Sequence, residues 1–471
     1  MEKQTDILLI QPPYPNLAFE TTNVPLGLAW LSAVLKREGF KTSAYDLQIE
    51  GTDLKKMGKY IEDIQPEIIG VQFHGQVSFN YSMDVLKYIK KTFPKIKVVV
   101  GGQQATFRPD PILDEGGADY IGLGEGELTL PELMKHMLGY PGASKPDSIP
   151  GLMYKKNGKT VVTERGGRID DLDSLPLPDR DVFQWQKYPQ WVILTSRGCP
   201  YECAFCSSSS FWGRTVRFRS AENVVSEMEQ LVEKYGVTSF LILDDTFTLK
   251  KNRVAKIADL IVEKKLPVKW GCGTRMDQID ESTLKDLKRA GCVEISFGLE
   301  TANQATLDRI KKDIKVKQQK HAIKIAKAAG FQTRVSTMLG LPGETEKEVR
   351  NTLNFLLEAQ PNEIQIYPIL PFDGTTFSSK TEDMGVSVCD ENYDNWVKDS
   401  FKPIAESRWL SRDSIVKMAK EMVATLSENG YTHMTGQEEL TKKKLDKVVS
   451  TGLTAFQLVE SYKTKKTEAK I

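Results

Sequence analysis

The chain has 471 residues, more than one ordinary domain accommodates, so we expect two or three domains. Its hydrophobic content of 40% and its charged content of 27% are typical of a globular protein. Lys and Arg number 64 and Asp and Glu number 63, so the chain lacks the one-sided charge that favours a dedicated binder of nucleic acid or of an anionic membrane.

The first residues, MEKQTDILLIQPPYP, contain a short apolar run that prolines soon interrupt. This segment lacks the longer apolar core and small-residue cleavage site of a signal peptide, and no stretch reaches the roughly 18 apolar residues of a membrane span. We therefore expect a cytoplasmic protein without a membrane span, whose thiols stay reduced. Three of the six cysteines fall within eight positions, which in a reducing compartment indicates metal binding or catalysis rather than disulfides.

Residues 1–140 alternate short apolar runs with helical patterns. The apolar runs lie at residues 7–11, 41–46, 67–73, 97–102 and 119–124, and helical patterns such as 27–37 and 82–91 lie between them. This alternation predicts an α/β domain with a doubly wound parallel sheet, Rossmann-like, which binds ligands in loops outside the carboxyl ends of its strands. Glycines occupy two of these loops, at Gly101 and Gly102 and at Gly122, Gly124 and Gly126. Tight turns alone would also explain each single glycine.

The rest of the chain divides into three predicted parts. Residues 141–185 are rich in Pro, Gly and Asp and read as a linker around a hairpin, LMYKKNGKTVVTE, with Asn157 and Gly158 at its turn. Residues 186–380 hold six further strand candidates separated by helical patterns: WVILTS, SFLILDD, VKWGCGT, EISFGLE, TRVSTMLG and IQIYPIL. They predict a partial (β/α)6 barrel of the TIM type, with chemistry at the C-terminal strand ends. Residues 381–471 are polar and helical in pattern, so we expect a helical region that covers the substrate and ends in a frayed, lysine-rich tail.

A cluster of three cysteines follows the first barrel strand. The stretch TSRGCPYECAFCSSSS contains Cys199, Cys203 and Cys206, while the next cysteine, Cys272, is far along the chain and no histidine lies near. Sites with four protein ligands need a fourth donor. Three thiolates on one loop instead hold three irons of a cubane and leave the fourth iron open to an amino and carboxylate pair. The alternatives are a structural zinc site that lacks one ligand, or buried cysteines without a metal.

This Cys-x-x-x-Cys-x-x-Cys spacing, with Phe205 before the last cysteine and Arg197-Gly198 before the first, resembles the radical S-adenosylmethionine (SAM) superfamily. The resemblance covers roughly residues 190–375. It implies a [4Fe–4S] cluster on the three cysteines that cleaves SAM to methionine and a 5′-deoxyadenosyl radical, which abstracts a hydrogen from the substrate.

The resemblance implies that Phe205 contacts SAM. Residues at other strand ends also match positions at which this superfamily contacts SAM. By this resemblance, Asp244 and Asp245 receive the methionine amino group, Arg275 pairs with the methionine carboxylate, Glu300 bonds the ribose hydroxyls, and the GLPGET turn that begins at Gly340 approaches the adenosine. The ordinary alternatives are a helix cap for Asp244 or Asp245 and a solvated acid for Glu300. Cys272 and Cys292 fit small core residues, and Cys389 is either an ordinary thiol or a hydrogen or electron donor.

The front domain, paired with this core, resembles the cobalamin-binding branch of the superfamily. The matching stretches are QPPYP, VPLGLAWLSAVLKREGF, VVVGGQQAT and DYIGLGEGELTLPEL. The resemblance implies a cobalamin contacted by Gln11, Pro12, Tyr14, His74, Gly101, Gly102, Gly124, Glu125 and Gly126. The loop after the first strand, QPPYPN, has no histidine for the cobalt, so we expect base-off cobalamin without a histidine below the metal. His74 lies beyond another strand, where a local hydrogen bond is the alternative to ligation of cobalt.

The function implied is a cobalamin-dependent radical SAM methyltransferase that acts on an unactivated carbon. One SAM would recharge cobalamin to methylcobalamin, and a second would supply the radical. A non-methylating rearrangement, cyclisation or epimerisation within the same branch is the first alternative, and an iron–sulfur electron carrier or redox-sensing module is the second. A tRNA-thiolating enzyme is disfavoured because residues 1–198 contain no cysteine. We expect a small-molecule or natural-product substrate and an external electron donor such as flavodoxin or ferredoxin, but no nucleic acid.

Overall fold

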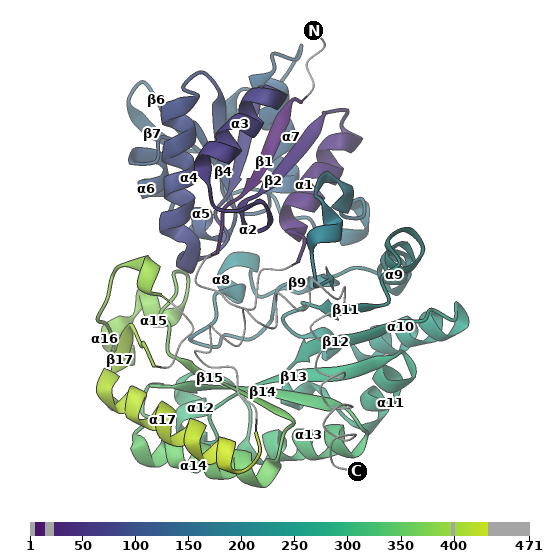
Figure 1. Ribbon diagram of the computed structural model, residues 1–471, viewed down its shortest axis with the longest axis vertical. Coiled ribbons are helices and arrows are strands. Elements are labelled where there is room, and N and C mark those ends of the chain that lie inside the picture. Colours follow the sequence, from purple (N-terminus) through teal and green to yellow (C-terminus); the bar gives the residue numbers. More distant parts are fainter. Residues whose placement is uncertain (1–4, 15–22, 397–400, 432–471) are drawn as a thin grey trace. The chain divides into compact units, whose positions relative to one another are not determined.

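The computed structural model describes residues 5–14, 23–396 and 401–431 (Figure 1). The chain forms two compact units that meet in sequence between Gln190 and Trp191. The predicted four-part division, with boundaries at 140, 185 and 380, stays a prediction.

The N-terminal unit contains a seven-stranded sheet in the order β2-β1-β3-β4-β5-β6-β7. The strands are β1 (Ile7–Gln11), β2 (Thr42–Asp46), β3 (Ile68–Gln72), β4 (Lys97–Gly101), β5 (Tyr120–Gly122), β6 (Leu152–Lys156) and β7 (Lys159–Val162). The first five are parallel, which confirms the predicted doubly wound sheet. Because β1 lies between β2 and β3, the chain reverses direction across the sheet there, and the crevice at the carboxyl ends of β1 and β3 is where such sheets bind ligands.

The predicted hairpin is confirmed and extends this sheet. β6 pairs with β5 and β7 with β6, both antiparallel. Asn157 and Gly158 connect the two hairpin strands with positive φ angles of 51° and 75°. A two-residue turn with two left-handed positions matches the twist of the strands and is the turn that Asn-Gly favours.

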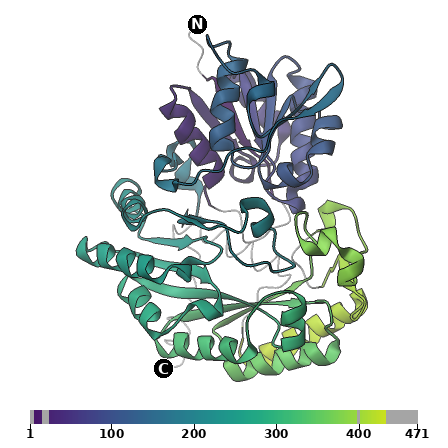
Figure 2. The same cartoon turned by 180° about the vertical axis from the view of Figure 1, so that it is seen from behind.

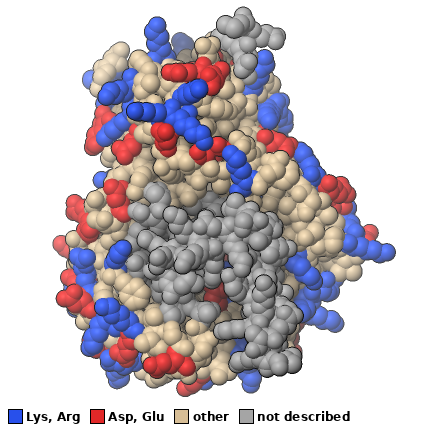
Figure 3. Space-filling model, in the orientation of Figure 1, with Lys and Arg blue, Asp and Glu red and all other residues tan. Residues whose placement is uncertain are grey.

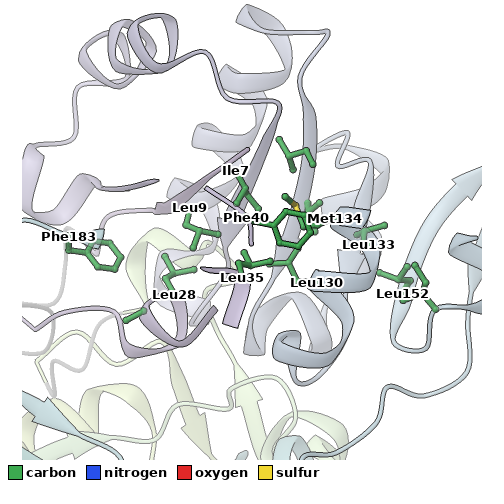
Figure 4. Close-up of a cluster of buried hydrophobic side chains, with 14 of the residues drawn as sticks. Ile7, Leu9, Leu28, Leu35, Phe40, Leu130, Leu133, Met134, Leu152 and Phe183 are labelled. Carbon is green, nitrogen blue, oxygen red and sulfur yellow. The ribbon is translucent and has the colours of Figure 1, made fainter. Parts of the chain in front are cut away.

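Helices lie on both sides of this sheet (Figure 1). They are α1 (Leu26–Arg37), α2 (Leu47–Glu50), α3 (Leu54–Ile64), α4 (Phe79–Thr92), α5 (Gln103–Phe107), α6 (Pro109–Asp114) and α7 (Gly126–Met137). α1 packs with α7, and α3 packs with α4. Figure 4 shows the core on the α1 and α7 side, where buried side chains of β1, both helices and β6 meet: Ile7, Leu9, Leu28, Leu35, Leu130, Leu133, Met134 and Leu152. Each fully buried aliphatic side chain of this kind contributes roughly 1.5–3 kcal/mol.

The segment between the hairpin and Gln190 packs back on the N-terminal unit. Phe183 joins the core just described. Asp179 Oδ2 accepts a hydrogen bond of 2.6 Å from Ser32 Oγ, and the Tyr188 hydroxyl donates to Asp46 Oδ2 at 2.7 Å. Burial raises the pKa of Asp46 to about 6, against the lowering effect of the Tyr188 bond. Short 3-10 turns carry this segment: Leu172–Ser174, Arg180–Val182 and Trp185–Lys187.

The second unit contains a six-stranded parallel sheet in the order β15-β14-β13-β12-β11-β8. Its strands are β8 (Val192–Ile193), β11 (Ser239–Ile242), β12 (Lys269–Thr274), β13 (Cys292–Glu300), β14 (Gln332–Leu339) and β15 (Glu363–Pro368). The first and last strands in sequence lie at opposite edges and do not pair. The predicted partial barrel of six strands is thus confirmed.

Apart from the short α8 (Ser208–Trp212), the helices between these strands are α9 (Ala221–Tyr235), α10 (Lys251–Glu263), α11 (Glu281–Arg289), α12 (Gln304–Arg309), α13 (Val316–Ala328) and α14 (Glu346–Ala359). From α10 to α14 they lie along the outer side of the sheet in both views (Figure 2). α9 shows why they form: Ser220 caps its start by accepting from the Asn223 N–H, and Gly236, with φ 68°, ends it. Between these caps, Val224, Met228 and Leu231 recur at helical spacing and are buried.

The C-terminal region is helical only in part. It contains α15 (Thr376–Ser379), α16 (Thr381–Met384) and α17 (Arg412–Glu428), and also an antiparallel pair, β16 (Val386–Val388) with β17 (Ala405–Ser407). α17 packs on α14, where Arg350 and Glu421 form an ion pair of 2.7 Å. The tail predicted to fray, residues 461–471, lies outside the described residues.

Charged side chains of both signs are interspersed over the visible face of each unit (Figure 3), in line with the balanced composition. Within the described residues, no helix combines the length and the hydropathy that crossing a membrane requires.

Candidate active site

The three cysteines lie on one loop of the second unit. This loop follows β8 and the short strand β9 (Ser196–Arg197), which pairs with β10 (Arg217–Phe218), and it leads into α8 (Ser208–Trp212). Gly198 opens the loop with φ 98°, and a Cβ there would lie 2.9 Å from the Thr215 carbonyl oxygen, so only glycine fits. The Cys206 N–H donates to the Cys203 carbonyl at 3.0 Å, and the Ala204 N–H donates to Ile310 at 2.9 Å. The backbone thus fixes the loop at the carboxyl end of the sheet.

The thiols are partly buried, and their surroundings disfavour the free thiolate. Burial raises the pKa of Cys199 and Cys203, and it raises the pKa of Cys206 to about 12. A metal cation reverses this preference, because the thiolate is the form that binds iron. Among the described residues, no set of three or more His, Cys, Asp or Glu side chains is arranged to hold one metal ion. Three thiols on one loop match the number of protein ligands that a [4Fe–4S] cluster with one open iron needs.

Two aspartates follow β11 and fix both ends of this loop. Asp244 accepts four hydrogen bonds, from the backbone N–H groups of Thr195 (2.6 Å) and Ser196 (3.2 Å) and from their hydroxyls (2.5 and 2.6 Å). Asp245 accepts from the Ser208 hydroxyl at 2.6 Å, and burial raises its pKa. The two residues therefore hold the segments before Cys199 and after Cys206. Their predicted contact with the methionine amino group stays a prediction.

Arg275, at the end of β12, is buried beside the cysteine loop. Its Nε and Nη2 donate to the carboxylate of Asp277 at 3.0 and 2.9 Å. Its Nη2 also donates to the Lys312 carbonyl at 2.7 Å, and Nη1 lies 3.9 Å from Cys203 Sγ. The guanidinium stacks over the Tyr201 ring at 3.6 Å. Asp277 thus occupies the edge of the guanidinium that Nε and Nη2 form. The predicted pairing of Arg275 with the methionine carboxylate stays a prediction.

Glu300 forms a buried ion pair that the sequence did not indicate. The register of β13 against β14 shifts between Gly298 and Glu300, and Glu300 adopts φ 63°. Its Oε1 lies 2.7 Å from Lys312 Nζ, and both side chains are less than a tenth exposed. Lys312 Nζ also lies 5.6 Å from the centroid of the Phe205 ring in the cysteine motif. Lys312 lies in a run of charged residues, and nothing in the local sequence distinguishes it from its neighbours as the partner of Glu300.

The GLPGET turn is held by a fully buried carboxyl group. Glu344 Oε2 accepts from the Gly340 and Leu341 N–H groups at 3.0 and 3.3 Å, and the Thr301 hydroxyl donates to Oε1 at 3.3 Å. Burial raises the pKa of Glu344 from its ordinary 4.5 to about 8, although these donors oppose the rise. Gly340 adopts φ 88° at the start of the turn. Glu344 therefore fixes the backbone that is predicted to approach adenosine.

The predicted cobalamin contacts of the first sheet lie at neighbouring strand ends. Gln11 is buried at the end of β1 and donates to the Pro12 carbonyl at 2.8 Å. The Tyr14 ring meets the ring of His74, which follows β3, edge-on at a centroid distance of 6.0 Å. β1 and β3 are paired neighbours, so the structure brings these residues together at the switch point of the sheet. Pro15 and Asn16, in the same predicted loop, lie outside the described residues.

The glycines after β4 and β5 divide into two kinds. Gly102 has φ 109°, and a Cβ there would lie 2.5 Å from the Phe73 carbonyl oxygen. A Cβ at Gly101 would lie 3.9 Å from the Gly122 carbonyl oxygen, which is an ordinary contact, and one at Gly124 would meet no heavy atom of the described residues within 4 Å. Glu125 accepts from the Ile169 N–H at 3.2 Å, and Gly126 begins α7. Gly101 and Gly124 thus leave room above the strand ends, as close approach of a bulky ligand requires.

Comparison with known proteins assigns both units. Residues 193–356 match the family model described as the radical SAM superfamily, and residues 16–134 match the B12 binding domain. The uncharacterised methyltransferase PH0819 of Pyrococcus horikoshii is 33% identical over 382 residues, which cover 79% of this chain and 82% of the relative. The anaerobic magnesium-protoporphyrin IX monomethyl ester cyclase of Cereibacter sphaeroides is 29% identical over 425 residues, 87% of this chain and 69% of the relative.

Among solved structures, the fold resembles the radical SAM methyltransferase TsrM from Kitasatospora setae, determined with cobalamin and a [4Fe–4S] cluster bound. The TM-score is 0.75 at 17% identity, over 94% of this chain and 99% of TsrM. Both family models are matched in one chain, in the two units that carry the thiol loop and the glycine loops. The chain therefore belongs to the cobalamin-binding branch of the radical SAM enzymes.

Proposed function

We propose that this enzyme is a methyltransferase that acts on an unactivated carbon of a small molecule. The observation that carries the proposal is the pairing of a three-cysteine loop with a cobalamin-type sheet whose first loop offers no histidine to cobalt. PH0819, the relative with 33% identity across both units, is named a methyltransferase, and TsrM shares the fold.

In this proposal the second unit holds the cluster and SAM. Cys199, Cys203 and Cys206 would hold the cluster, and SAM would bind beside it. The remaining SAM contacts proposed are Phe205, Asp244, Asp245, Arg275, Glu300 and Gly340. When bound, the cluster and SAM supply a 5′-deoxyadenosyl radical, and cobalamin supplies a carrier for the methyl group.

The chain's own residues position these groups. Asp244 and Asp245 fix the segments on either side of the cysteine loop. Glu344 fixes the adenosine turn. In the first unit, the proposed cobalamin contacts come from the ends of β1, β3, β4 and β5: Gln11, Pro12, Tyr14, His74, Gly101, Gly102, Gly124, Glu125 and Gly126. The room at Gly101 and Gly124 supports this placement.

The substrate site is proposed in the segment after β15. The stretches PFDGTT and RWLSRDS, with Phe401 and Trp409, are candidates for its lining. The rings of Phe372 and Trp396 lie tilted to each other with centroids 6.2 Å apart, and the Trp409 ring lies 4.8 Å from the Arg309 guanidinium. We further propose an external one-electron donor such as flavodoxin or ferredoxin, and a cytoplasmic location, which the crowded thiols support.

The test uses the full chain reconstituted anaerobically with iron, sulfide and cobalamin, then desalted. We expect cobalt absorbance to stay with the protein and dithionite plus SAM to release 5′-deoxyadenosine. With methyl-deuterated SAM and a substrate, the label should appear in the product. Loss of cobalt absorbance on desalting would contradict the cobalamin assignment. A fully loaded cluster that releases no 5′-deoxyadenosine would favour the electron carrier instead.

A second candidate function is a cyclisation or related rearrangement without methyl transfer. The Cereibacter sphaeroides cyclase, which aligns with 87% of this chain, favours it. The labelled SAM separates the two candidates, because a cyclised product would carry no deuterated methyl group while 5′-deoxyadenosine would still form.

A further inference from the structure

Arg275 presents one nitrogen of an immobilised guanidinium to a cysteine of the cluster motif. Asp277 accepts from Nε and Nη2, and the Lys312 carbonyl accepts from Nη2 as well. Tyr201, inside the cysteine motif, lies under the guanidinium plane at 3.6 Å, and its hydroxyl accepts from Gln278 Nε2 at 2.7 Å. These contacts leave Nη1 as the nitrogen that faces the loop, 3.9 Å from Cys203 Sγ.

Arg275 also places a positive charge next to Cys203. Arginine stays protonated at every relevant pH, and this side chain is only 6% exposed, so solvent screens its charge weakly. A cluster becomes more negative by one charge when it accepts an electron. A nearby cation, and an N–H that points at a ligand sulfur, therefore stabilise the reduced cluster more than the oxidised one, which raises the reduction potential. Asp277 offsets part of this effect and holds the guanidinium in place.

We infer that Arg275 tunes the cluster through Cys203, making it easier to reduce. This inference rests on the proposed function, because it requires the cluster on Cys199, Cys203 and Cys206. It assigns Nη1 of Arg275 a contact with the cluster ligand Cys203, while Asp277 holds the edge formed by Nε and Nη2.

The test is an anaerobic redox titration of the reconstituted full chain with dithionite and mediators, followed by electron paramagnetic resonance of the reduced cluster. At a fixed solution potential, Arg275→Gln should lower the ratio of reduced to oxidised cluster about tenfold. For a one-electron couple this equals a shift of the reduction potential by about 59 mV to a more negative value. Arg275→Lys keeps the positive charge but loses the planar set of guanidinium N–H donors, so its shift of the reduction potential should be smaller and in the same direction. Asp277→Asn removes the counter-charge and should shift the potential the opposite way.

Arg289→Gln is the matched control. It removes the same charge from an arginine of α11 that pairs with Asp259 and Asp286. This control should keep the wild-type potential. If Arg275→Gln leaves the potential unchanged, or if both glutamine variants shift it equally, the inference is wrong while the cluster assignment stands.

The cluster content of each sample distinguishes failure of the proposed function from failure of the inference about Arg275. Iron and sulfide are measured in every sample. A wild-type chain that takes up no cluster contradicts the proposed function itself, and with it the inference. If Arg275→Gln fails to assemble a cluster, the test relies on Arg275→Lys and Asp277→Asn. The inference is wrong if these two variants keep the wild-type reduction potential, or if both shift it in the same direction.

Discussion

The carboxylate of Asp244 holds Ser196 twice, with Oδ1 3.2 Å from the backbone nitrogen and Oδ2 2.6 Å from the hydroxyl oxygen. Together with two bonds from Thr195, this contact joins the end of β11 to the segment that leads into Cys199. The carboxylate is the acceptor in all four bonds, and it is buried. The start of the cysteine loop is therefore fixed by an acid from a neighbouring strand.

Asp244→Asn should destabilise the protein and loosen the cysteine loop. The amide keeps one oxygen but turns an NH2 group toward donors, so a buried group loses its partner at a cost of about 2–3 kcal/mol. We expect a lower urea midpoint and faster loss of iron to a chelator. Asp245→Asn, which disturbs a single bond to Ser208, is the control and should lose less stability. Equal effects of the two variants would contradict this prediction.

In the proposed site each of Cys199, Cys203 and Cys206 holds one iron. Alanine at any of them should abolish cluster binding, because the cubane would then have two irons without a protein ligand. Iron and sulfide content after anaerobic reconstitution measures the loss. Cys389→Ala, at an exposed cysteine, should retain the full content. Retention of an intact cluster by any of the three motif variants would exclude that cysteine as a ligand.

Gly101 and Gly102 should respond differently to alanine. At Gly102 the positive φ and the Phe73 carbonyl, 2.5 Å from the new Cβ, cost roughly 1–3 kcal/mol or more, so the folded protein loses stability. At Gly101 the new Cβ has only an ordinary contact, so the variant should fold normally. If cobalamin approaches this loop, Gly101→Ala should nonetheless retain less cobalamin on desalting. Thermal melting and cobalt absorbance, measured on both variants, separate the two effects.

The Glu300–Lys312 pair should show strong coupling. Lys312→Met leaves a buried carboxylate without its cation, at a cost of about 3–5 kcal/mol. The double variant Glu300→Gln with Lys312→Met removes both charges and should recover a large part of that loss. Urea unfolding of the two single variants and the double variant forms the cycle. Additive losses would show that the two side chains do not stabilise each other.

The contribution of Glu344 to the free energy of unfolding should fall as pH rises. The pKa of Glu344 is about 8 in the folded protein and near its ordinary 4.5 in the unfolded chain, so the folded state binds the extra proton between these values. Its contribution is therefore most favourable below pH 4.5 and declines until about pH 8. Glu344→Gln imitates the protonated side chain and should remove this decline. The difference in melting temperature between wild type and variant, followed from pH 5 to pH 9, should grow with pH, and a constant difference would contradict the assignment.

The sequence by itself determined the local features of this protein. Alternating apolar runs and helical patterns identified all five parallel strands of the first sheet and all six of the second, because each strand carries its own apolar signal. Asn157-Gly158 identified the hairpin, since that dipeptide tolerates two left-handed positions. The spacing of Cys199, Cys203 and Cys206 defined the candidate cluster loop, because ligands within one loop need no distant partner.

Only the tertiary structure decided which distant residues meet. Asp244 binds Thr195 and Ser196 because β11 and β8 pair in the sheet, although some 50 positions separate them. Lys312 pairs with Glu300 next to a shift in strand register, and Tyr188 donates to Asp46 across the first unit. None of these partners has a periodic or spacing signal of its own. Their contacts depend on strand order and on desolvation inside the fold, which no local stretch of sequence encodes.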